Sequence, residues 1–176
     1  MDTKQKILST ASKLFYEQGY NSTGINQVIK EAAVAKASFY QHFPSKEDLL
    51  LAYLVTTQEN TDKEMRAQIA KCKTPREQVL ALFDFLSKLA RQTSFKGCNF
   101  LNIAAELPND QGKVRSIIRK QKNGIRNLFA EILKPAGKED LADEIYLLFD
   151  AALVSGKVYA DVWPVKTARK IVEKLI

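Results

Sequence analysis

The segment KASFYQHF, residues 36–43, places several side chains with hydrogen-bonding groups in one short stretch. It holds a lysine, a serine, a tyrosine, a glutamine and the only histidine of the chain. A glutamine can make two hydrogen bonds to adenine, and lysine, serine and tyrosine can bond to phosphate oxygens. On the outer face of a helix, these residue types would suit the major groove of double-stranded DNA.

Two short helices joined by a turn would hold this segment in place. Apolar residues at helical spacing form the first of them, at Ile25, Val28, Ile29 and Ala32. Residues 33–35 are predicted as the turn, and Pro44 closes the second helix. In such a helix-turn-helix the second helix enters the groove and the first braces it. Phe39 and Phe43 are expected in the core. The residues left outside are Lys36, Ala37, Ser38, Tyr40, Gln41 and His42.

The rest of the chain also has the apolar spacing of helices. Stripes at three- and four-residue intervals cover residues 7–15, 49–69, 79–90 and 114–132. Gly19 and Pro108 are stop signals, and Thr74-Pro75 is a start signal. No alternating strand pattern, internal repeat or low-complexity tract competes with this interpretation. The prediction is an all-α fold of about nine helices.

The predicted helices divide into a small head and a larger body. Three short helices precede residue 46, and longer ones follow. We predict a helix-turn-helix DNA-binding domain at residues 1–46 and a ligand-binding and dimerisation domain at residues 47–176. No flexible linker separates the two.

Composition narrows the function classes. The 176 residues carry 27 basic and 20 acidic side chains, a net charge of +7, which is compatible with nucleic acid but weak support alone. The chain has neither a leader pattern nor a run of about 20 apolar residues, so we expect a cytoplasmic protein with no membrane partner. Cys72 and Cys98 lack CxxC spacing, and no metal or other cofactor is expected.

The run from residue 7 to residue 50 resembles the N-terminal DNA-binding domain of TetR-type transcriptional repressors. The matching features are Phe15 and Gly19 at the end of the first helix, a threonine opening the second, the Ala-Val turn, the Phe-Tyr-x-x-Phe helix, and Ser-Lys-x-x-Leu opening the fourth. The resemblance covers about a quarter of the chain. It implies a ligand-responsive regulator, a repressor in the first place, that binds a palindromic operator as a dimer and is released by a small effector.

The resemblance also implies which residues touch DNA. By motif position Tyr40 and Lys46 would contact phosphates, with Thr23 and Lys36 as further backbone contacts, although Lys46 as a merely solvated charge stays open. The full candidate set is Thr23, Gly24, Lys36, Ala37, Ser38, Tyr40, Gln41, His42 and Lys46.

Three positions depart from the family pattern. Ala33 and Ala35 stand where glycine and serine are usual, so the turn is less permissive and the third helix lacks a side-chain cap. Gly24 replaces a second hydroxyl residue, which would remove a phosphate contact. We expect weaker binding or a shifted docking angle.

The segment from Leu141 to Tyr159 is apolar on more than one face, which implies a second partner surface. Small residues there would allow close helix approach, and Pro164 begins a last amphipathic helix. We predict a homodimer interface formed by this pair. A helix buried within one subunit is the alternative. The candidate interface residues are Ala151, Ala152, Ser155, Gly156, Val165, Ala168 and Val172.

An unknown small-molecule effector is implied by the family resemblance, bound in the helical body. Candidate pocket residues are Tyr53, Phe85, Phe95, Cys98, Phe100, Asn102, Tyr146 and Phe149, each of which could instead be plain core. The Gly97-Cys98 pair resembles a subgroup in which some members sense electrophiles or oxidants through a cysteine. Lys96 and a nearby helix N-terminus would favour the thiolate. A small buried hydrophobic role is the alternative for Cys98.

Two other function classes compete with a DNA-binding regulator. An enzyme would need Cys98 as nucleophile and His42 as base, but these belong to different predicted domains, so no enzymatic activity is expected. A helical protein-interaction or ligand-binding module without sequence-specific DNA binding would explain the apolar stripes equally well. It would leave the KASFYQHF pattern unexplained.

Overall fold

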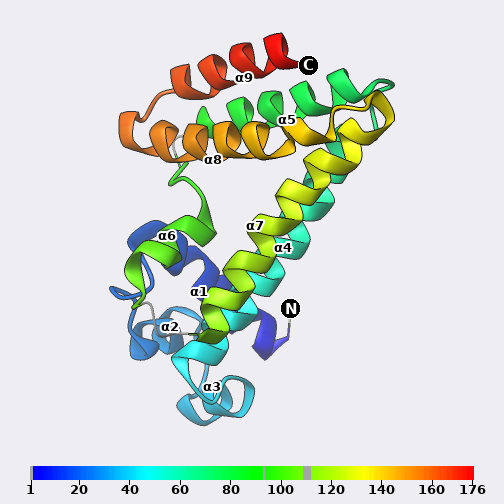
Figure 1. Ribbon diagram of the computed structural model, residues 1–176. Helices are drawn as coiled ribbons and strands as arrows, with labels where there is room; N and C mark the ends of the chain where they lie inside the picture. Colours follow the sequence, from blue (N-terminus) through cyan, green and yellow to red (C-terminus); the bar gives the residue numbers. More distant parts are fainter. Residues whose placement is uncertain (1, 93, 109–111) are drawn as a thin grey trace. The chain divides into compact units, whose positions relative to one another are not determined.

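The computed structural model describes residues 2–92, 94–108 and 112–176. These residues form nine α-helices and two 3-10 helices, with no β-strand among them, which confirms the predicted all-α fold (Figure 1). The α-helices are α1 (Thr3–Gln18), α2 (Ile25–Glu31), α3 (Lys36–His42), α4 (Lys46–Ile69), α5 (Pro75–Ala90), α6 (Asn99–Glu106), α7 (Gly112–Leu133), α8 (Ala142–Tyr159) and α9 (Trp163–Leu175), and the 3-10 helices are Lys134–Ala136 and Glu139–Leu141.

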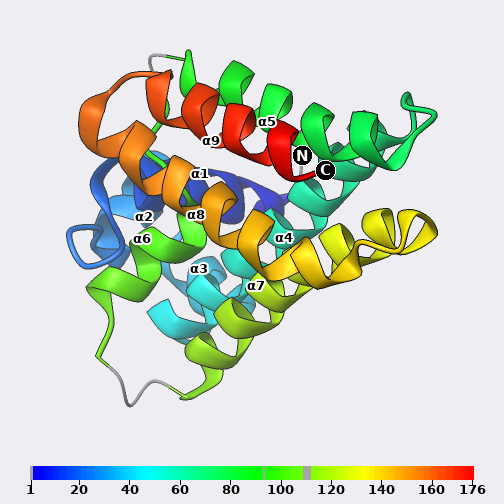
Figure 2. The same cartoon turned by 45° about the horizontal axis from the view of Figure 1, so that its top comes forward.

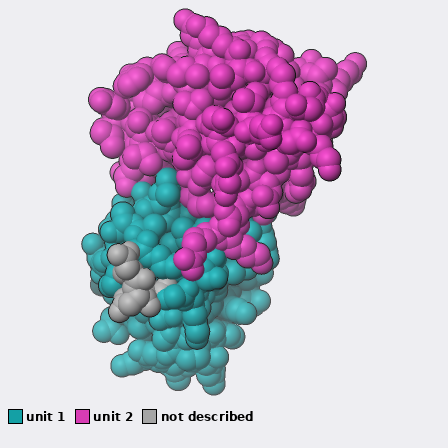
Figure 3. Space-filling view, in the orientation of Figure 1, with its two compact units in different colours: residues 1–59, 99–118 teal, residues 60–98, 119–176 magenta. Residues whose placement is uncertain are grey.

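The chain divides into two compact units. Unit 1 comprises Met1–Glu59 and Asn99–Ile118, and unit 2 comprises Asn60–Cys98 and Arg119–Ile176 (Figure 3). Unit 1 therefore holds α1 to α3, the first part of α4, all of α6 and the start of α7. The predicted boundary after residue 46 does not coincide with a boundary between the compact units, and the functional division stays a prediction.

Local sequence signals position the helices of unit 1. Asp2 caps α1, because its Oδ1 accepts a hydrogen bond from the backbone N–H of Gln5 at 2.8 Å. Gly19 ends the helix at φ 94° and ψ 158°, a conformation open essentially to glycine alone. Phe39 and Phe43 are buried in the core of this unit, as predicted.

The turn between α2 and α3 is built without the usual glycine and serine. Ala33 has a positive φ of 52°, in the left-handed region that costs an L-residue roughly 1–2 kcal/mol. Ala35 occupies the N-cap of α3 and provides no side-chain hydrogen bond, which confirms the predicted loss of that cap. Helix α3, which carries the candidate base-contacting residues, is therefore positioned by its packed face rather than by a side-chain cap.

Unit 2 is centred on an aromatic core. Helix α5 begins at the predicted Thr74-Pro75 start signal, with a complete capping box in which Thr74 and Glu77 bond each other's backbone. Phe149 of α8 makes edge-to-face contacts with Phe83 and Phe129, at centroid distances of 5.4 and 5.7 Å. Helices α5, α8 and α9 pack side by side around this core (Figures 1 and 2). No described helix is both long and apolar enough to cross a membrane.

Candidate functional site

Helix α3 presents a polar surface. Lys36, Gln41 and His42 are exposed and Ser38 is half-buried. Tyr40 is 41% exposed, with its ring edge-to-face against Phe39 at 5.2 Å, so the core holds the phenol at the surface. Because one face of this seven-residue helix fills the core and the other faces solvent, its outward polar groups can meet base edges and phosphates.

The residues at the start of α2 differ in exposure, although both Thr23 and Gly24 were predicted to contact DNA. Thr23 has no exposed surface, and its hydroxyl donates a hydrogen bond to the carbonyl oxygen of Gly19 at 2.7 Å. Gln18 donates to the same hydroxyl at 3.2 Å. Thr23 thus holds the α1–α2 loop, and we leave it out of the DNA-contacting set proposed below. Gly24 is exposed at the N-cap of α2.

Lys46 begins α4, beside a well-formed cap. The Ser45 hydroxyl oxygen accepts a hydrogen bond from the backbone N–H of Asp48 at 3.0 Å. The Lys46 ammonium lies 4.2 Å from the centroid of the Tyr20 ring, in cation–π geometry. Burial lowers the pKa of Lys46, and the negative charge of Glu106 opposes that change. Burial raises the pKa of Tyr20, and Glu47 adds to that rise.

A partly buried polar network lies in unit 2. The Lys122 Nζ donates to Asp150 Oδ1 at 2.9 Å and to Cys98 Sγ at 3.3 Å. The Tyr146 hydroxyl donates to Asp150 Oδ2 at 2.7 Å. Burial, together with the Asp150 carboxylate, raises the pKa of Tyr146 well above its ordinary value. An ammonium, a thiol, a carboxylate and a phenol are thereby joined in one cluster, which we call the Cys98 network.

The Cys98 network also borders the surface. Tyr146 lines an open pocket of unit 2, whose other walls are Asn123, Arg126, Asp143 and Leu147. The Arg126 guanidinium and Asp143 carboxylate form two hydrogen bonds there, of 2.8 and 2.7 Å. A molecule in this pocket would contact a residue whose hydroxyl is bonded into the network.

The predicted effector residues are split between the units. Cys98 and Tyr146 belong to the Cys98 network, whereas Phe149 is part of the aromatic core of unit 2. Phe85 and Phe95, also in unit 2, are partly buried against that core. The residues in unit 1 are Tyr53, Phe100 and Asn102, of which Tyr53 packs edge-to-face on Phe15 at 5.5 Å.

The sequence prediction missed Lys122 and Asp150. The sequence does contain a signal for both residues, because each is a charged residue inside an apolar pattern. Lys122 lies on the helical stripe of Ile118 and Ile125, and Asp150 interrupts the run LLFDAALV. A charged side chain among apolar residues needs a partner of opposite charge, and Lys122 and Asp150 form that ion pair with each other.

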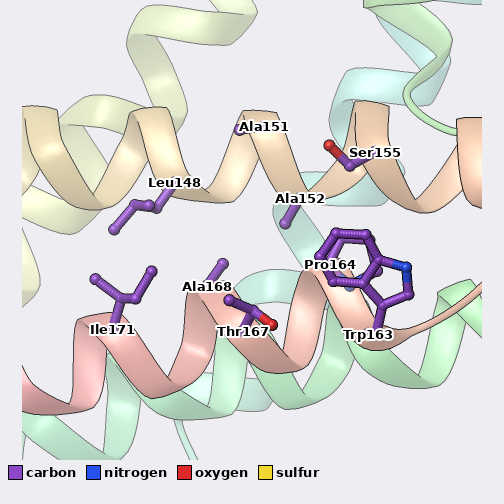
Figure 4. A pocket seen from close by; sticks show the side chains of 9 residues that line it. All are labelled: Leu148, Ala151, Ala152, Ser155, Trp163, Pro164, Thr167, Ala168 and Ile171. Carbon is purple, nitrogen blue, oxygen red and sulfur yellow. The ribbon is translucent and has the colours of Figure 1, made fainter.

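The predicted dimer-interface residues lie mostly inside unit 2. Five of the seven are buried, where α8 meets its neighbours: Ala152, Gly156, Val165, Ala168 and Val172. Ala151 is exposed and Ser155 is half-buried, and both line an open groove between α8 and α9 (Figure 4). Leu148, Trp163 and Ile171 line the same groove.

Large apolar side chains are exposed along the same two helices. Val158 is the most exposed of them, at 72%. Tyr159 and Trp163 pack their rings at 5.0 Å near the α8–α9 connection. The complete set is Leu147, Val154, Val158, Tyr159, Trp163, Ile171 and Leu175. Exposed large apolar side chains thus gather on these two adjacent helices.

These features define a class of protein: an all-helical regulator with a helix-turn-helix head. The family model for bacterial regulatory proteins of the tetR family matches residues 7–53. The HTH-type transcriptional regulator LmrA of Bacillus subtilis is 31% identical over 161 residues, which are 88% of this chain and 84% of LmrA.

Solved structures share the fold. A TetR-family transcriptional regulator from Streptomyces coelicolor, SCO4454, superposes with a TM-score of 0.92 at 27% identity, over 98% of this chain and 87% of that one. The reduced form of Escherichia coli NemR gives a TM-score of 0.87 at 24% identity, over 99% and 97% of the two chains. The chain belongs to the TetR family of helix-turn-helix transcriptional regulators. Membership implies DNA binding and dimerisation, and no enzymatic role.

Proposed function

We propose that this protein represses transcription by binding a palindromic operator as a homodimer, and that a small effector bound in the helical body releases it. The observation that carries the proposal is the polar surface of α3, with Lys36, Tyr40, Gln41 and His42 exposed. Gln41 is assigned to a base edge, and Lys36 and Tyr40 are assigned to phosphates. The net charge of +7 favours association with DNA.

Fluorescence anisotropy with DNA from just upstream of the coding sequence tests this assignment. Unrelated DNA of equal length is the control, and both are titrated at two salt concentrations. Gln41→Ala should lose affinity at one base position only, whereas Lys36→Ala should weaken all sequences and reduce the salt slope by about 1. Equal binding of the parent protein to both DNAs would refute an operator-specific function and favour a helical interaction module.

The exposed apolar residues of α8 and α9 support a dimer through these helices. Ala151 and Ser155 on the α8–α9 groove would allow a second copy to approach closely. Such a dimer must place its two α3 helices about 34–36 Å apart, or at a spacing matched to the operator. Val158→Glu should give monomers in sedimentation velocity, while Asn60→Glu on the exposed surface of α4 introduces the same charge away from α8 and α9 and serves as the control. A dimer that persists in Val158→Glu would contradict this interface.

A second candidate function is oxidant or electrophile sensing by Cys98, as in the Gly-Cys subgroup. The specific observation in its favour is the 3.3 Å contact between Cys98 Sγ and Lys122 Nζ, which places a charged hydrogen-bond donor against the sulfur. N-ethylmaleimide, which adds a thiol across its C=C bond, is a suitable probe.

Cys72 provides the matched control for this function, because it is also a half-buried free cysteine. N-ethylmaleimide should release operator DNA from the parent protein and from Cys72→Ser, but not from Cys98→Ser. Unchanged release from Cys98→Ser would refute sensing by this residue.

A further inference from the structure

The loop between α1 and α2 is bonded to the last residue of α6. Glu106 Oε2 accepts a hydrogen bond from the backbone N–H of Asn21 at 2.8 Å, and the Asn21 side chain donates to the backbone carbonyl of Glu106 at 2.9 Å. The Glu106 carboxylate also fills the space beside Gly19, since a Cβ there would lie 2.9 Å from Glu106 Oε1. All three residues belong to unit 1. We call these three contacts the Glu106 clamp.

The end of α6 is itself held in place within unit 1. Arg115, near the start of α7, donates from Nη2 to the backbone carbonyl of Leu107 at 2.7 Å. Leu107 is buried, as are Phe100 and Ile103 of α6. Arg115 and α6 lie in the same compact unit as α1 and α2. The Glu106 clamp therefore ties the α1–α2 loop to a helix that packing and a hydrogen bond already fix.

Helices α2 and α3 depend on neighbouring elements for their position. Each has seven residues, and helices of that length are marginal on their own in water. Their N-cap residues, Gly24 and Ala35, make no side-chain capping bond, and Ala33 between the helices has a left-handed backbone. The α1–α2 loop leads directly into Gly24, so a contact that fixes this loop also fixes the start of α2. Glu106 supplies such a contact.

We propose that Glu106 is a positioning residue of the DNA-binding surface, which fixes the α1–α2 loop and thereby the start of α2 and the helix α3 that follows it. This inference rests on the proposed operator binding. A segment held in place before DNA arrives loses less conformational entropy on binding, so the Glu106 clamp raises operator affinity. The DNA-binding unit then includes the last residue of α6, which lies outside residues 7–53 that match the family model.

Glu106→Ala and Glu106→Gln form a matched pair of variants. Both remove the negative charge, and only the glutamine can still accept a hydrogen bond from the Asn21 N–H. Fluorescence anisotropy measures their affinity for the operator and for unrelated DNA of equal length. We expect Glu106→Ala to bind the operator about three- to tenfold more weakly than Glu106→Gln, as for the loss of one hydrogen bond. Affinity for unrelated DNA depends on charge rather than on the position of α3, so it should be the same in both variants.

Asn21→Ala tests the Glu106 clamp from the loop side, because it removes the side-chain bond and leaves the backbone N–H in place. It should also weaken operator binding, and by less in the Glu106→Ala background than in the parent protein, since the two bonds hold one contact. Ser22→Ala changes the next exposed side chain of the loop and should stay within about twofold of the parent. Thermal melts followed by circular dichroism establish that each variant is folded. If Glu106→Ala does not fold, Asn21→Ala compared with Ser22→Ala provides the same test.

The outcomes distinguish the role of Glu106 from the proposed function. Selective operator binding by the parent protein, with Glu106→Ala binding at least as tightly as Glu106→Gln, would overturn the role of Glu106 alone. Weaker binding of Glu106→Ala to operator and unrelated DNA alike would also overturn it, since the substitution would then reduce the folded fraction of the protein. Equal binding of the parent protein to both DNAs would overturn the proposed operator binding, and this inference with it.

Discussion

Two lysines, one in each compact unit, differ in how deeply they are buried and in which groups they contact. In the Cys98 network, Lys122 and Asp150 have side chains only 10% and 16% exposed, and the ammonium has two partners at hydrogen-bond distance. In unit 1, Lys46 is half-buried and its ammonium lies 4.2 Å from the centroid of the Tyr20 ring. Lys122 is therefore part of a nearly solvent-free ion pair, whereas Lys46 keeps part of its surface in contact with water.

The difference follows from the cost of moving each charge. A buried ion pair attracts strongly only because both charges have lost water, so breaking it leaves an uncompensated charge in a poor environment. A half-exposed lysine returns to water or to a phosphate at little cost. Changing the partner of a lysine is therefore less costly at Lys46 in unit 1 than in the Cys98 network of unit 2.

The largest expected effect comes from removing one partner of the buried pair. Asp150→Ala leaves Lys122 buried without a counter-charge, and we expect the free energy of unfolding to fall by about 3–5 kcal/mol. Urea denaturation followed by circular dichroism measures the loss.

The double variant Lys122→Met, Asp150→Leu is the control for Asp150→Ala. It removes both charges and keeps apolar volume, so it should recover most of the lost stability. If Asp150→Ala costs less than 1 kcal/mol, the network is more hydrated than its geometry indicates, and the contrast between the two lysines fails.

Gly19→Ala should have the next largest effect, this time on the loop between α1 and α2 in unit 1. The backbone of Gly19 lies in a region that costs other residues about 1–3 kcal/mol, and the added Cβ would meet the Glu106 carboxylate at 2.9 Å. We expect a loss in that range by urea denaturation. In a Glu106→Ala background the backbone cost should remain and the steric part should vanish. A fully neutral Gly19→Ala would mean that this loop adopts another conformation.

Tyr146→Phe tests the edge of the Cys98 network. It removes one hydrogen bond to a carboxylate, so we expect a loss of about 1–2 kcal/mol at neutral pH. The pKa of Tyr146 is raised on folding above its ordinary 10.0, so the folded protein keeps the proton longer than the unfolded chain does. Stability from this group is therefore complete below pH 10 and declines as the pH rises further. Tyr146→Phe should show a shallower decline above pH 10 in thermal melts.

The elements of the fold could be predicted because their signals are local. Gly19 as a helix stop, the Thr74 capping box and the buried positions of Phe39 and Phe43 all depend on residues within a few positions of one another. The missing cap at Ala35 was predicted for the same reason. Helical spacing and end signals suffice for such features.

The sites depend on partners that are distant in sequence. Lys122 and Asp150 are 28 residues apart, and Glu106 and Asn21 are 85 apart, so no local pattern pairs them. Small residues on α8 indicate close approach by another helix but do not say which one. In the structure α9 of the same chain packs against α8, and Ala152 of α8 and Ala168 of α9 are both buried. A charge inside an apolar stripe predicts that a partner exists, and only the packing identifies it.

The smallest effect is expected at the surface of the same unit, and it provides the sharpest control for the buried pair. Arg126 and Asp143 also join α7 to α8, with two hydrogen bonds of 2.8 and 2.7 Å, but their side chains are 42% and 62% exposed. Since water screens this pair, Asp143→Ala should cost no more than about 1 kcal/mol, and less in 1 M salt. Urea denaturation of Asp143→Ala and Asp150→Ala under the same conditions compares the free energy of unfolding lost with the exposed pair and with the buried pair. Equal losses would show that bond geometry, rather than burial, sets the strength of the α7–α8 ion pairs.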